Sequence, residues 1–193
     1  MSSPQGPPSS VDSMFFSLYT QFMHLMIDLE TLATTPDAAI LTIGACLFDP
    51  KGNDVHSTYY ERIKLESQEN YGRVINEDTL AWWSQQDKQI QEDAFGEGDD
   101  RIDLKDAMKK LYTFGLGSSN VWSHGSIFDI VIVENICRHF QQAVTWKFWE
   151  VRDTRTLFDL ANIEVKIQGK HNALTDAIAQ SKAVQTAYKK LSI

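Results

Sequence analysis

The chain has 193 residues, of which 42% are hydrophobic and 23% charged, and its 18 basic and 26 acidic side chains give a formal net charge of −8. This length fits one domain with a sizeable core, and the composition is that of an ordinary globular protein. No apolar run reaches the length of a membrane span, so we expect no membrane partner. The negative net charge argues against non-specific binding to a nucleic-acid duplex that is driven by charge alone. It does not exclude a nucleic-acid enzyme, because acids that hold cations become attractive to phosphate.

The two cysteines, Cys46 and Cys137, both lie in apolar segments. No cluster of Cys and His has the spacing of a zinc site. We therefore expect buried free thiols in a reducing compartment.

The first 22 residues differ in composition from the rest of the chain. Residues 1–13 are rich in Ser and Pro and show no apolar period, which predicts that residues 1–22 form a disordered or flexible leader. Residues 14–19 are apolar but lack the basic start and the cleavage-site pattern of a secretory signal. We expect residues 23–193 to form a single domain.

Three strands are predicted at the start of this domain, over residues 24–30, 39–48 and 55–65. Their connections are short and carry turn residues, such as Pro36 and the cluster over 49–53. Short connections of this kind predict an antiparallel meander.

The rest of the chain is mainly helical in its pattern. Asn76 is a predicted N-cap, and Asp103 is predicted to begin a helix whose apolar side chains share one face. Helices are expected after these two residues and over 86–94, 128–140, 154–161 and 171–191, and strands over 120–124 and 146–151. We therefore predict an α/β fold: a mixed sheet of three antiparallel strands plus parallel strands, flanked by α-helices.

The stretch from His24 to Thr31 carries the first chemical signal, because an apolar run leads into Asp28 and Glu30. Side chains alternate along a strand, so these two acids share a face. They repel each other and are costly to bury, and a bound divalent cation is the usual compensation. The alternative is that the strand ends at Asp28 and that water solvates both acids.

Two later segments supply further candidates. Asp129 follows a short apolar strand and a turn with Gly125, and its alternative role is to stabilise a helix N-terminus. His171 and Asp176 stand five residues apart near the start of the last helix, which is not the i, i+4 spacing of a helical zinc site. They can face one cleft at different depths, and the alternative is a capping histidine with a solvated acid.

Together, these segments hold four carboxylates and one histidine, the set that two-metal phosphodiester hydrolysis requires. Two Mg²⁺ or Mn²⁺ ions about 3.5–4 Å apart clamp the attacking and leaving oxygens in such sites. Hard cations prefer oxygen ligands, and a histidine near neutrality can take the proton of the attacking water.

The motifs, in this order, resemble the DEDD superfamily of 3′-to-5′ exonucleases, histidine subgroup (DEDDh). Asp28-Leu29-Glu30-Thr31 is similar to its first motif, Phe128-Asp129 to its second, and His171 to Ala177, as H-x4-D followed by Ala, to its third. The resemblance covers about residues 23–190. A narrower resemblance, to small phage- and prophage-borne exonucleases of the DexA-like and exodeoxyribonuclease-VIII-like group, is carried by Thr35 to Ile40, Leu80 to Trp83 and Arg152 to Thr156.

The resemblance implies an RNase H-like fold and a nucleoside 5′-monophosphate as product. It implies that two Mg²⁺ or Mn²⁺ ions are bound and that His171 is the general base. The implied metal ligands are Asp28, Glu30, Asp129 and Asp176. The backbone around Thr31 and Leu32 would hold the terminal nucleotide, and Leu32 and Phe128 would touch its base or sugar. His124, a further expected substrate contact, stands where many relatives are expected to carry Asn.

Trp82 and Trp83 point about 100° apart on a helix, so at most one packs easily in the core. We include Trp83 among the candidate substrate contacts, as a side chain that stacks on a base, with core packing of both as the alternative. Arg152 and Arg155 are candidates for phosphate contacts, and salt bridges on a helix surface are the alternative.

The predicted function is divalent-metal-dependent, 3′-to-5′ hydrolysis of single-stranded DNA. The same chemistry on RNA is an open alternative. A non-catalytic nucleic-acid-binding module is another, and the intact acids and histidine argue against it. A proofreading subunit is a third, for which the short leader is a poor partner-binding extension. We expect a cytoplasmic location in a bacterial or phage-infected cell and leave a homo-oligomer open.

Overall fold

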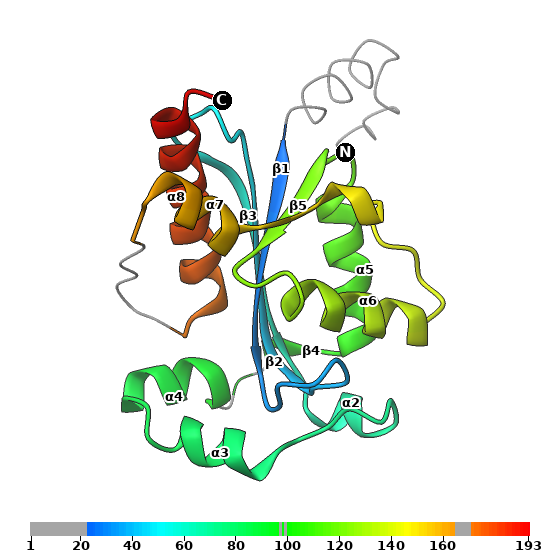
Figure 1. Cartoon of the computed structure of the whole chain (residues 1–193). Helices are drawn as coiled ribbons and strands as arrows, with labels where there is room; N and C mark the ends of the chain where they lie inside the picture. The colour runs from blue at the N-terminus through cyan, green and yellow to red at the C-terminus, as the bar shows by residue number, and fades with distance from the viewer. Residues whose placement is uncertain (1–22, 97, 99, 165–170) are drawn as a thin grey trace, which may run out of the picture.

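The computed structural model of the chain describes residues 23–96, 98, 100–164 and 171–193. Its centre is a six-stranded mixed sheet with the order β4-β3-β2-β1-β5-β6 (Figure 1). β1, β2 and β3 pair antiparallel, β4 adds in parallel to β3, and β5 and β6 continue in parallel from β1. The strands are β1 His24–Thr31, β2 Ile40–Phe48, β3 Val55–Ile63, β4 Arg101–Ile102, β5 Asn120–Ser123 and β6 Val151–Asp153.

Helices cover both faces of this sheet and one of its ends. In Figure 1, α5 and α6 lie against one face, α7 and α8 against the other, and α3 and α4 beyond one end of the strands. The helices are α2 Glu66–Glu69, α3 Glu77–Trp83, α4 Lys88–Phe95, α5 Leu104–Gly115, α6 Asp129–His139, the 3-10 helix η1 Phe148–Glu150, α7 Thr154–Ala161 and α8 Ala173–Leu191.

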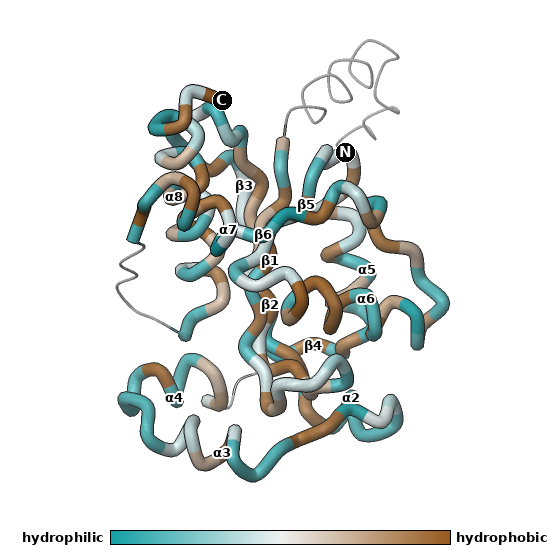
Figure 2. The backbone as a smooth tube through the Cα atoms, viewed as in Figure 1, coloured by the Kyte–Doolittle hydropathy of each residue, from teal (hydrophilic) through white to brown (hydrophobic). Residues whose placement is uncertain are grey.

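Each face of the sheet has its own hydrophobic cluster, because side chains alternate along the strands. On β1, Leu25, Ile27 and Leu29 belong to the cluster under α5 and α6, whereas Met26 belongs to the cluster under α7 and α8. The hydrophobic segments of Figure 2 accordingly follow the central strands. Asp28 and Glu30 have the parity of Met26, so β1 presents both acids on the side of α7 and α8.

The α/β class and the antiparallel meander are confirmed. The predicted N-cap is also confirmed, because the Asn76 side chain accepts a hydrogen bond from the backbone N of Thr79 at 3.1 Å. Asp103, expected to begin a helix, stands just before α5 and caps it, with its side chain accepting from the backbone N of Lys105 at 2.8 Å. Both cysteines are free and buried, as expected.

The strand expected over residues 146–151 is wrong in its position. The Glu150 carboxylate accepts a hydrogen bond from the backbone N of Lys147 at 2.7 Å, which closes the turn of η1. β6 begins only at Val151, where it pairs with Val121 of β5. The elements α2 and β4 have four and two residues, too few for a periodic signal, and the sequence does not predict them.

The expected leader, residues 1–22, lies outside the described residues and stays a prediction, as do the cellular location and the oligomeric state. Within the described ranges, no helix combines the length and the apolar character that crossing a membrane requires.

The contact between α8 and the sheet depends on Gly44 in β2. A Cβ at this position would lie 2.1 Å from the backbone carbonyl carbon of Ala173 and 2.3 Å from the backbone N of Leu174. Gly44 is also the cross-strand partner of Asp28. The absence of a side chain therefore lets the first turn of α8, which carries Asp176, lie directly over β1 and β2.

We expect Gly44→Ala to lower the free energy of unfolding by about 1–3 kcal/mol or more, because the new methyl overlaps backbone atoms that cannot rotate away. Urea denaturation followed by circular dichroism measures this loss. Gly52→Ala is the matched control, since its methyl would approach the surrounding atoms no closer than 3.2 Å. Equal stability of the two variants would contradict the role of Gly44.

Candidate active site

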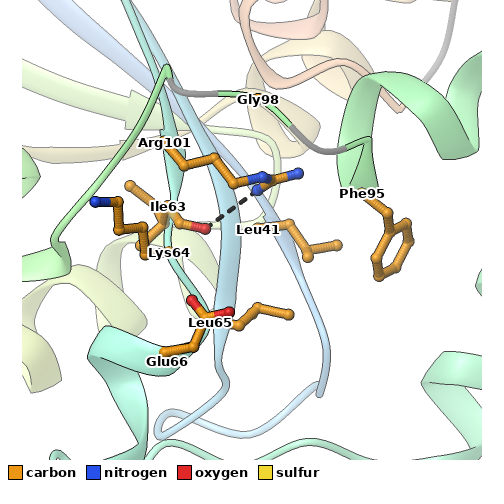
Figure 3. A pocket seen from close by; sticks show the side chains of 8 residues that line it. All are labelled: Leu41, Ile63, Lys64, Leu65, Glu66, Phe95, Gly98 and Arg101. Carbon is orange, nitrogen blue, oxygen red and sulfur yellow. Dashed lines mark hydrogen bonds between the residues drawn. The ribbon is translucent and has the colours of Figure 1, made fainter.

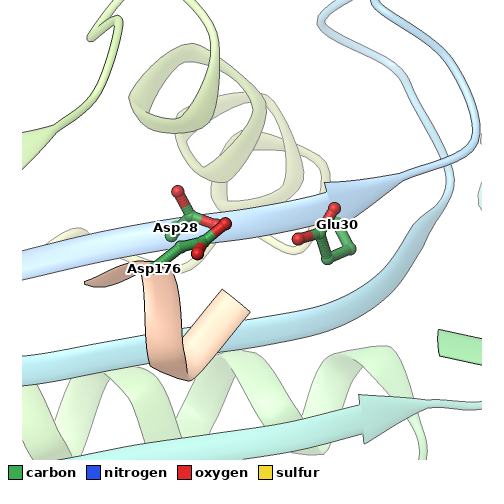
Figure 4. A group of neighbouring side chains, drawn as sticks. All are labelled: Asp28, Glu30 and Asp176. Carbon is green, nitrogen blue, oxygen red and sulfur yellow. The ribbon is translucent and has the colours of Figure 1, made fainter. Parts of the chain in front are cut away.

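Three carboxylates from two elements converge beside the end of β1. Asp28 and Glu30 of β1 and Asp176 of α8 each offer one oxygen, and these oxygens lie within 4.8 Å of one another (Figure 4). The two strand acids meet because they share a face, and Asp176 joins them because α8 rests on Gly44. A close set of carboxylate oxygens is the kind of donor set that hard divalent cations prefer.

Asp129 reaches the same place from a third segment. It is the first residue of α6, is 4% exposed, and its Oδ1 accepts a hydrogen bond from the backbone N of Leu29 at 3.1 Å. This bond fixes the start of α6 to β1 between the two strand acids. Next to burial, the charge of Asp129 is a cause of the raised pKa of both Asp28 and Glu30, so its carboxylate faces the same space.

The four acids are electrostatically strained. Burial, followed by the charges of Asp129 and Glu30, raises the pKa of Asp28 well above its usual range, and a hydrogen bond from Gln180 opposes the rise. Burial, followed by the charges of Asp176 and Asp129, raises the pKa of Glu30 to about 8. Burial also raises the pKa of Asp129, to about 7. Divalent cations offset such repulsion, so the residues present fit Mg²⁺ or Mn²⁺.

His171 lies just before α8, at the rim of the acids. Its backbone N donates to Asp176 Oδ2 at 3.0 Å, and its φ of 70° is in the left-handed region that few residues other than glycine adopt. Its ring meets that of Trp82 edge-on, with the centroids 4.8 Å apart. A tight turn and an aromatic wall thus place His171 in the lining of the same hollow as the carboxylates.

Two adjoining hollows form one groove. The first, of about 650 Å³, opens over the acids and is called the carboxylate hollow; its lining includes Asp28, Glu30, His124, Phe128, Asp129, Arg155, His171, Asp176 and Gln180. The second, of about 500 Å³, lies between the end of β1 and α3 and is called the aromatic hollow; its lining includes Thr31, Thr34, Asn76, Trp82, Trp83 and Phe128. Leu29, Glu30 and Phe128 line both hollows, so a ligand in one adjoins the other.

The structure separates the two adjacent tryptophans. Trp83 is 2% exposed, and its Nε1 donates to the backbone O of Thr31 at 2.9 Å, so it supports the end of β1 from beneath. Trp82 is 41% exposed and presents its ring at the surface of the groove. Trp82 is therefore better placed than Trp83 to stack on a base.

Of the expected substrate contacts, Thr31, Trp83 and Phe128 line the aromatic hollow and His124 lines the carboxylate hollow. Leu32 lines neither hollow; it is 1% exposed and packs with Leu41 in a separate cluster. The structure therefore does not place its side chain where a nucleotide would touch it. The register of β1 shifts between Glu30 and Thr31, which breaks the alternation just before this residue.

Sequence reasoning missed Gln180. This side chain is 2% exposed, and its Nε2 donates to Asp28 Oδ1 at 2.7 Å. Gln180 lies one turn beyond Asp176, so both side chains share a face of α8. This helical spacing is the signal that could have identified Gln180.

Sequence reasoning also missed the bonds that hold the turn between β5 and α6. Asp153 Oδ2 accepts a hydrogen bond from the backbone N of Ser126 at 2.6 Å. The Nδ1 of His124 lies 2.8 Å from Thr154 Oγ1, a hydrogen-bond distance. These contacts tie the turn that carries Phe128 and Asp129 to the start of α7. The partners are far apart in the chain, so no local pattern predicts them.

Another hollow, of about 730 Å³, lies at the β3–β4 edge of the sheet (Figure 3). The guanidinium of Arg101 donates there to the backbone O of Ile63 at 3.1 Å, of Ala94 at 2.7 Å and of Gly96 at 3.1 Å. These bonds fasten α4 to the sheet and explain the arginine structurally. Glu66 is the single acid among the described lining residues, so we assign the chemistry to the carboxylate hollow.

Comparison with known proteins agrees with this geometry. A family model described as the 3′-5′ exoribonuclease Rv2179c-like domain matches residues 23–188. The exodeoxyribonuclease of Enterobacteria phage T4 is 24% identical over 159 residues, which are 68% of this chain and 68% of that relative. The resemblance to DEDDh exonucleases is thereby confirmed.

Solved structures share the fold at low sequence identity. The nuclease domain of 3′hExo, a DEDDh family member bound to rAMP, has a TM-score of 0.54 at 11% identity, over 87% of this chain and 92% of that one. Escherichia coli exonuclease I with a dA16 oligonucleotide has a TM-score of 0.62 at 14% identity, over 88% of this chain. This chain spans 41% of the length of that exonuclease I chain. Schizosaccharomyces pombe Pop2p, in a form with Mg²⁺ and Mn²⁺, has a TM-score of 0.55 at 12% identity, over 92% of this chain and 87% of that one.

We expect the cation-free protein to lose stability as the pH rises from about 5 to 8. Glu30 has a folded-state pKa of about 8 against an ordinary 4.5, so between these values the folded chain binds a proton that the unfolded chain has released. Stability must then fall with rising pH, by up to about 1.4 kcal/mol per pH unit for each such group. Melting temperatures in EDTA measure the slope.

Glu30→Gln is the control for this experiment, because it removes one of the shifted groups and should flatten the slope. Saturating Mg²⁺ should raise the melting temperature most at the upper end of the range. A melting temperature that rises with pH in EDTA would contradict the electrostatic description of the site.

Proposed function

Because the chain belongs to the 3′-5′ exoribonuclease Rv2179c-like domain family, we propose that its carboxylate hollow hydrolyses the 3′-terminal phosphodiester bond of a nucleic-acid strand. The observation that carries the proposal is the set of three carboxylates, Asp28, Glu30 and Asp176, with ligand oxygens within 4.8 Å. The product is a nucleoside 5′-monophosphate, and the shortened strand is the next substrate.

In this proposal the acids and His171 have different roles. Asp28, Glu30, Asp129 and Asp176 would hold the divalent ions, which when bound supply the positive charge that activates water and stabilises the leaving oxygen. His171 lies at the rim of these acids and takes the proton of the attacking water as general base.

The terminal nucleoside occupies the aromatic hollow. Its volume of about 500 Å³ and its lining by Trp82, Trp83 and Phe128 suit one unpaired base and its sugar. Thr31 adds backbone and hydroxyl groups beside the sugar. A base must be unpaired to enter this hollow. This requirement supports a single-stranded 3′ end as the substrate.

We propose single-stranded DNA as the first substrate to test, supported by the printed name of the phage T4 relative, an exodeoxyribonuclease. RNA is the second candidate, supported by the description of the family as exoribonuclease-like. The two differ by the 2′-hydroxyl group, which the aromatic hollow would have to accept or exclude.

Digestion of 5′-labelled single strands tests the proposal. With Mg²⁺ or Mn²⁺, we expect a descending ladder from DNA, RNA or both, and EDTA should abolish it because the four acids then repel one another and the phosphate. Duplexes of the same sequence are the control for strandedness. Full activity in EDTA, or immediate release of a labelled 5′ mononucleotide, would refute the mechanism or its polarity.

His171→Ala should lower turnover by roughly 10²- to 10⁴-fold, the usual contribution of a general base. Divalent-cation affinity should change little, because the four acids remain. Single-turnover kinetics and calorimetric titration with Mn²⁺ measure the two quantities.

His139→Ala is the matched control, because this exposed histidine ends α6 and lines neither hollow. Loss of cation binding together with activity in His171→Ala would make the histidine a ligand. A turnover near that of the wild type would remove it from the mechanism.

A further inference from the structure

A basic side chain faces the acidic groove on the side away from the aromatic hollow. Arg155, the second residue of α7, lines the carboxylate hollow. A Cβ on Gly125, whose φ is 108°, would lie 3.5 Å from the central carbon of the guanidinium, so this group lies over the turn between β5 and α6. Within the described ranges the ion pairs are Arg62–Asp100, Lys109–Asp106 and Lys110–Glu61, and Arg155 takes part in none of them.

The backbone beneath Arg155 is held firmly. Asp153 caps α7, with Oδ1 accepting from the backbone N of Arg155 at 2.8 Å, and its Oδ2 accepts from the backbone N of Ser126 at 2.6 Å. Thr154, which is fully buried, contacts the His124 ring at 2.8 Å. The start of α7 and the turn that carries Asp129 are therefore one unit, and the backbone of Arg155 keeps its place relative to that turn.

Arg155 lies on the Asp129 side of the carboxylate cluster. Its guanidinium lies over Gly125, in the turn that leads into Asp129, and its side chain is absent from the lining of the aromatic hollow. The groove therefore runs from the aromatic hollow, past Glu30 and the other acids, to Arg155. With the terminal nucleoside in the aromatic hollow and the scissile phosphate at the acids, the upstream strand leaves toward Arg155.

We propose that Arg155 binds the next phosphate upstream of the scissile one, the 5′-phosphate of the penultimate nucleotide. This inference rests on the proposed function. A guanidinium can bind two oxygens of one phosphate at the same time. The carboxylates of the same hollow, in contrast, repel a phosphate when they hold no cation. Asp159 also lines the hollow, one turn further along α7, but no ion pair joins it to Arg155 in the described residues. Arg155 would thus bind the nucleic-acid strand at a point outside the four acids.

Two dinucleotides of the sugar that the enzyme prefers test this subsite. One carries a 5′-hydroxyl and has only the scissile phosphate, and the other carries a 5′-phosphate and adds the phosphate that Arg155 would bind. Wild-type enzyme should hydrolyse the phosphorylated dinucleotide with a kcat/KM about tenfold higher, the usual contribution of a charge-assisted hydrogen bond. Arg155→Ala should bring the ratio of the two kcat/KM values close to one.

Arg152→Ala is the matched control and should keep the ratio of the wild type. Arg152 is also exposed, but its guanidinium donates to the backbone O of Trp149 and Val151 and it lines neither hollow. Arg155→Lys keeps the charge without the planar fork and should give an intermediate ratio. An equal loss on both dinucleotides would mean that Arg155 acts on the scissile group or on folding, and would overturn the subsite.

Salt dependence on a longer single strand gives an independent readout. Removal of one phosphate contact should reduce the slope of log KM against log salt by about 0.7 in Arg155→Ala and leave it unchanged in Arg152→Ala. A wild type that hydrolyses both dinucleotides equally keeps the proposed function and overturns the Arg155 subsite. A wild type that hydrolyses no nucleic acid with Mg²⁺ or Mn²⁺ overturns the proposed function itself.

Discussion

The backbone contact between α8 and β2 at Gly44 sets the geometry of the whole site. Gly44 pairs across the sheet with Asp28, and the first turn of α8, with Asp176, lies on it. A side chain here would hold the helix away from the sheet and separate the acids. Further along α8, the Gln185 side chain donates to the backbone O of Asp49 and of Asp54, each at 2.9 Å, so the helix is fixed to the β2–β3 turn as well. Because α8 is held at two places, it can keep the carboxylate of Asp176 close to the other acids despite their mutual repulsion.

This rigidity is what makes a strained carboxylate cluster useful. Four acids in one buried place repel one another, and a flexible site would relieve that repulsion by moving them apart. Asp129 is held by the backbone of Leu29, and Asp28 by the side chain of Gln180. Because the oxygens cannot separate, the electrostatic strain is relieved by protons or by divalent cations. The scaffold therefore converts a destabilising charge distribution into a preference for a doubly charged ligand.

The sequence predicts those parts of the site that follow local periodicity. Asp28 and Glu30 share a face because β1 alternates regularly as far as Glu30. The contact of Leu32 with a nucleotide is implied by the family resemblance and not by periodicity, and the structure buries this side chain just after a register shift that has no local signal. The helical angle between Trp82 and Trp83 predicts that at most one is buried, but only packing against Thr31 decides which one. The contact at Gly44 joins residues about 130 positions apart, beyond the reach of any periodic pattern.

Strand order explains why the groove has its components in a fixed sequence. β1 and β5 are parallel neighbours, so their carboxyl ends meet at one end of the sheet, where the acids of β1 and Asp129, which follows β5, come together. β6 continues in parallel beyond β5, so α7 starts at the same end of the sheet and brings Arg155 over the turn that leads into Asp129. α3 lies beyond the end of β1 and supplies the aromatic hollow on the other side of the acids. The aromatic wall of α3 lies beyond the end of β1, Asp129 follows β5 and Arg155 follows β6, so the groove presents the aromatic wall, the carboxylates and the arginine in that order. Under the proposed function, a nucleic-acid strand laid along this groove would meet all three in turn.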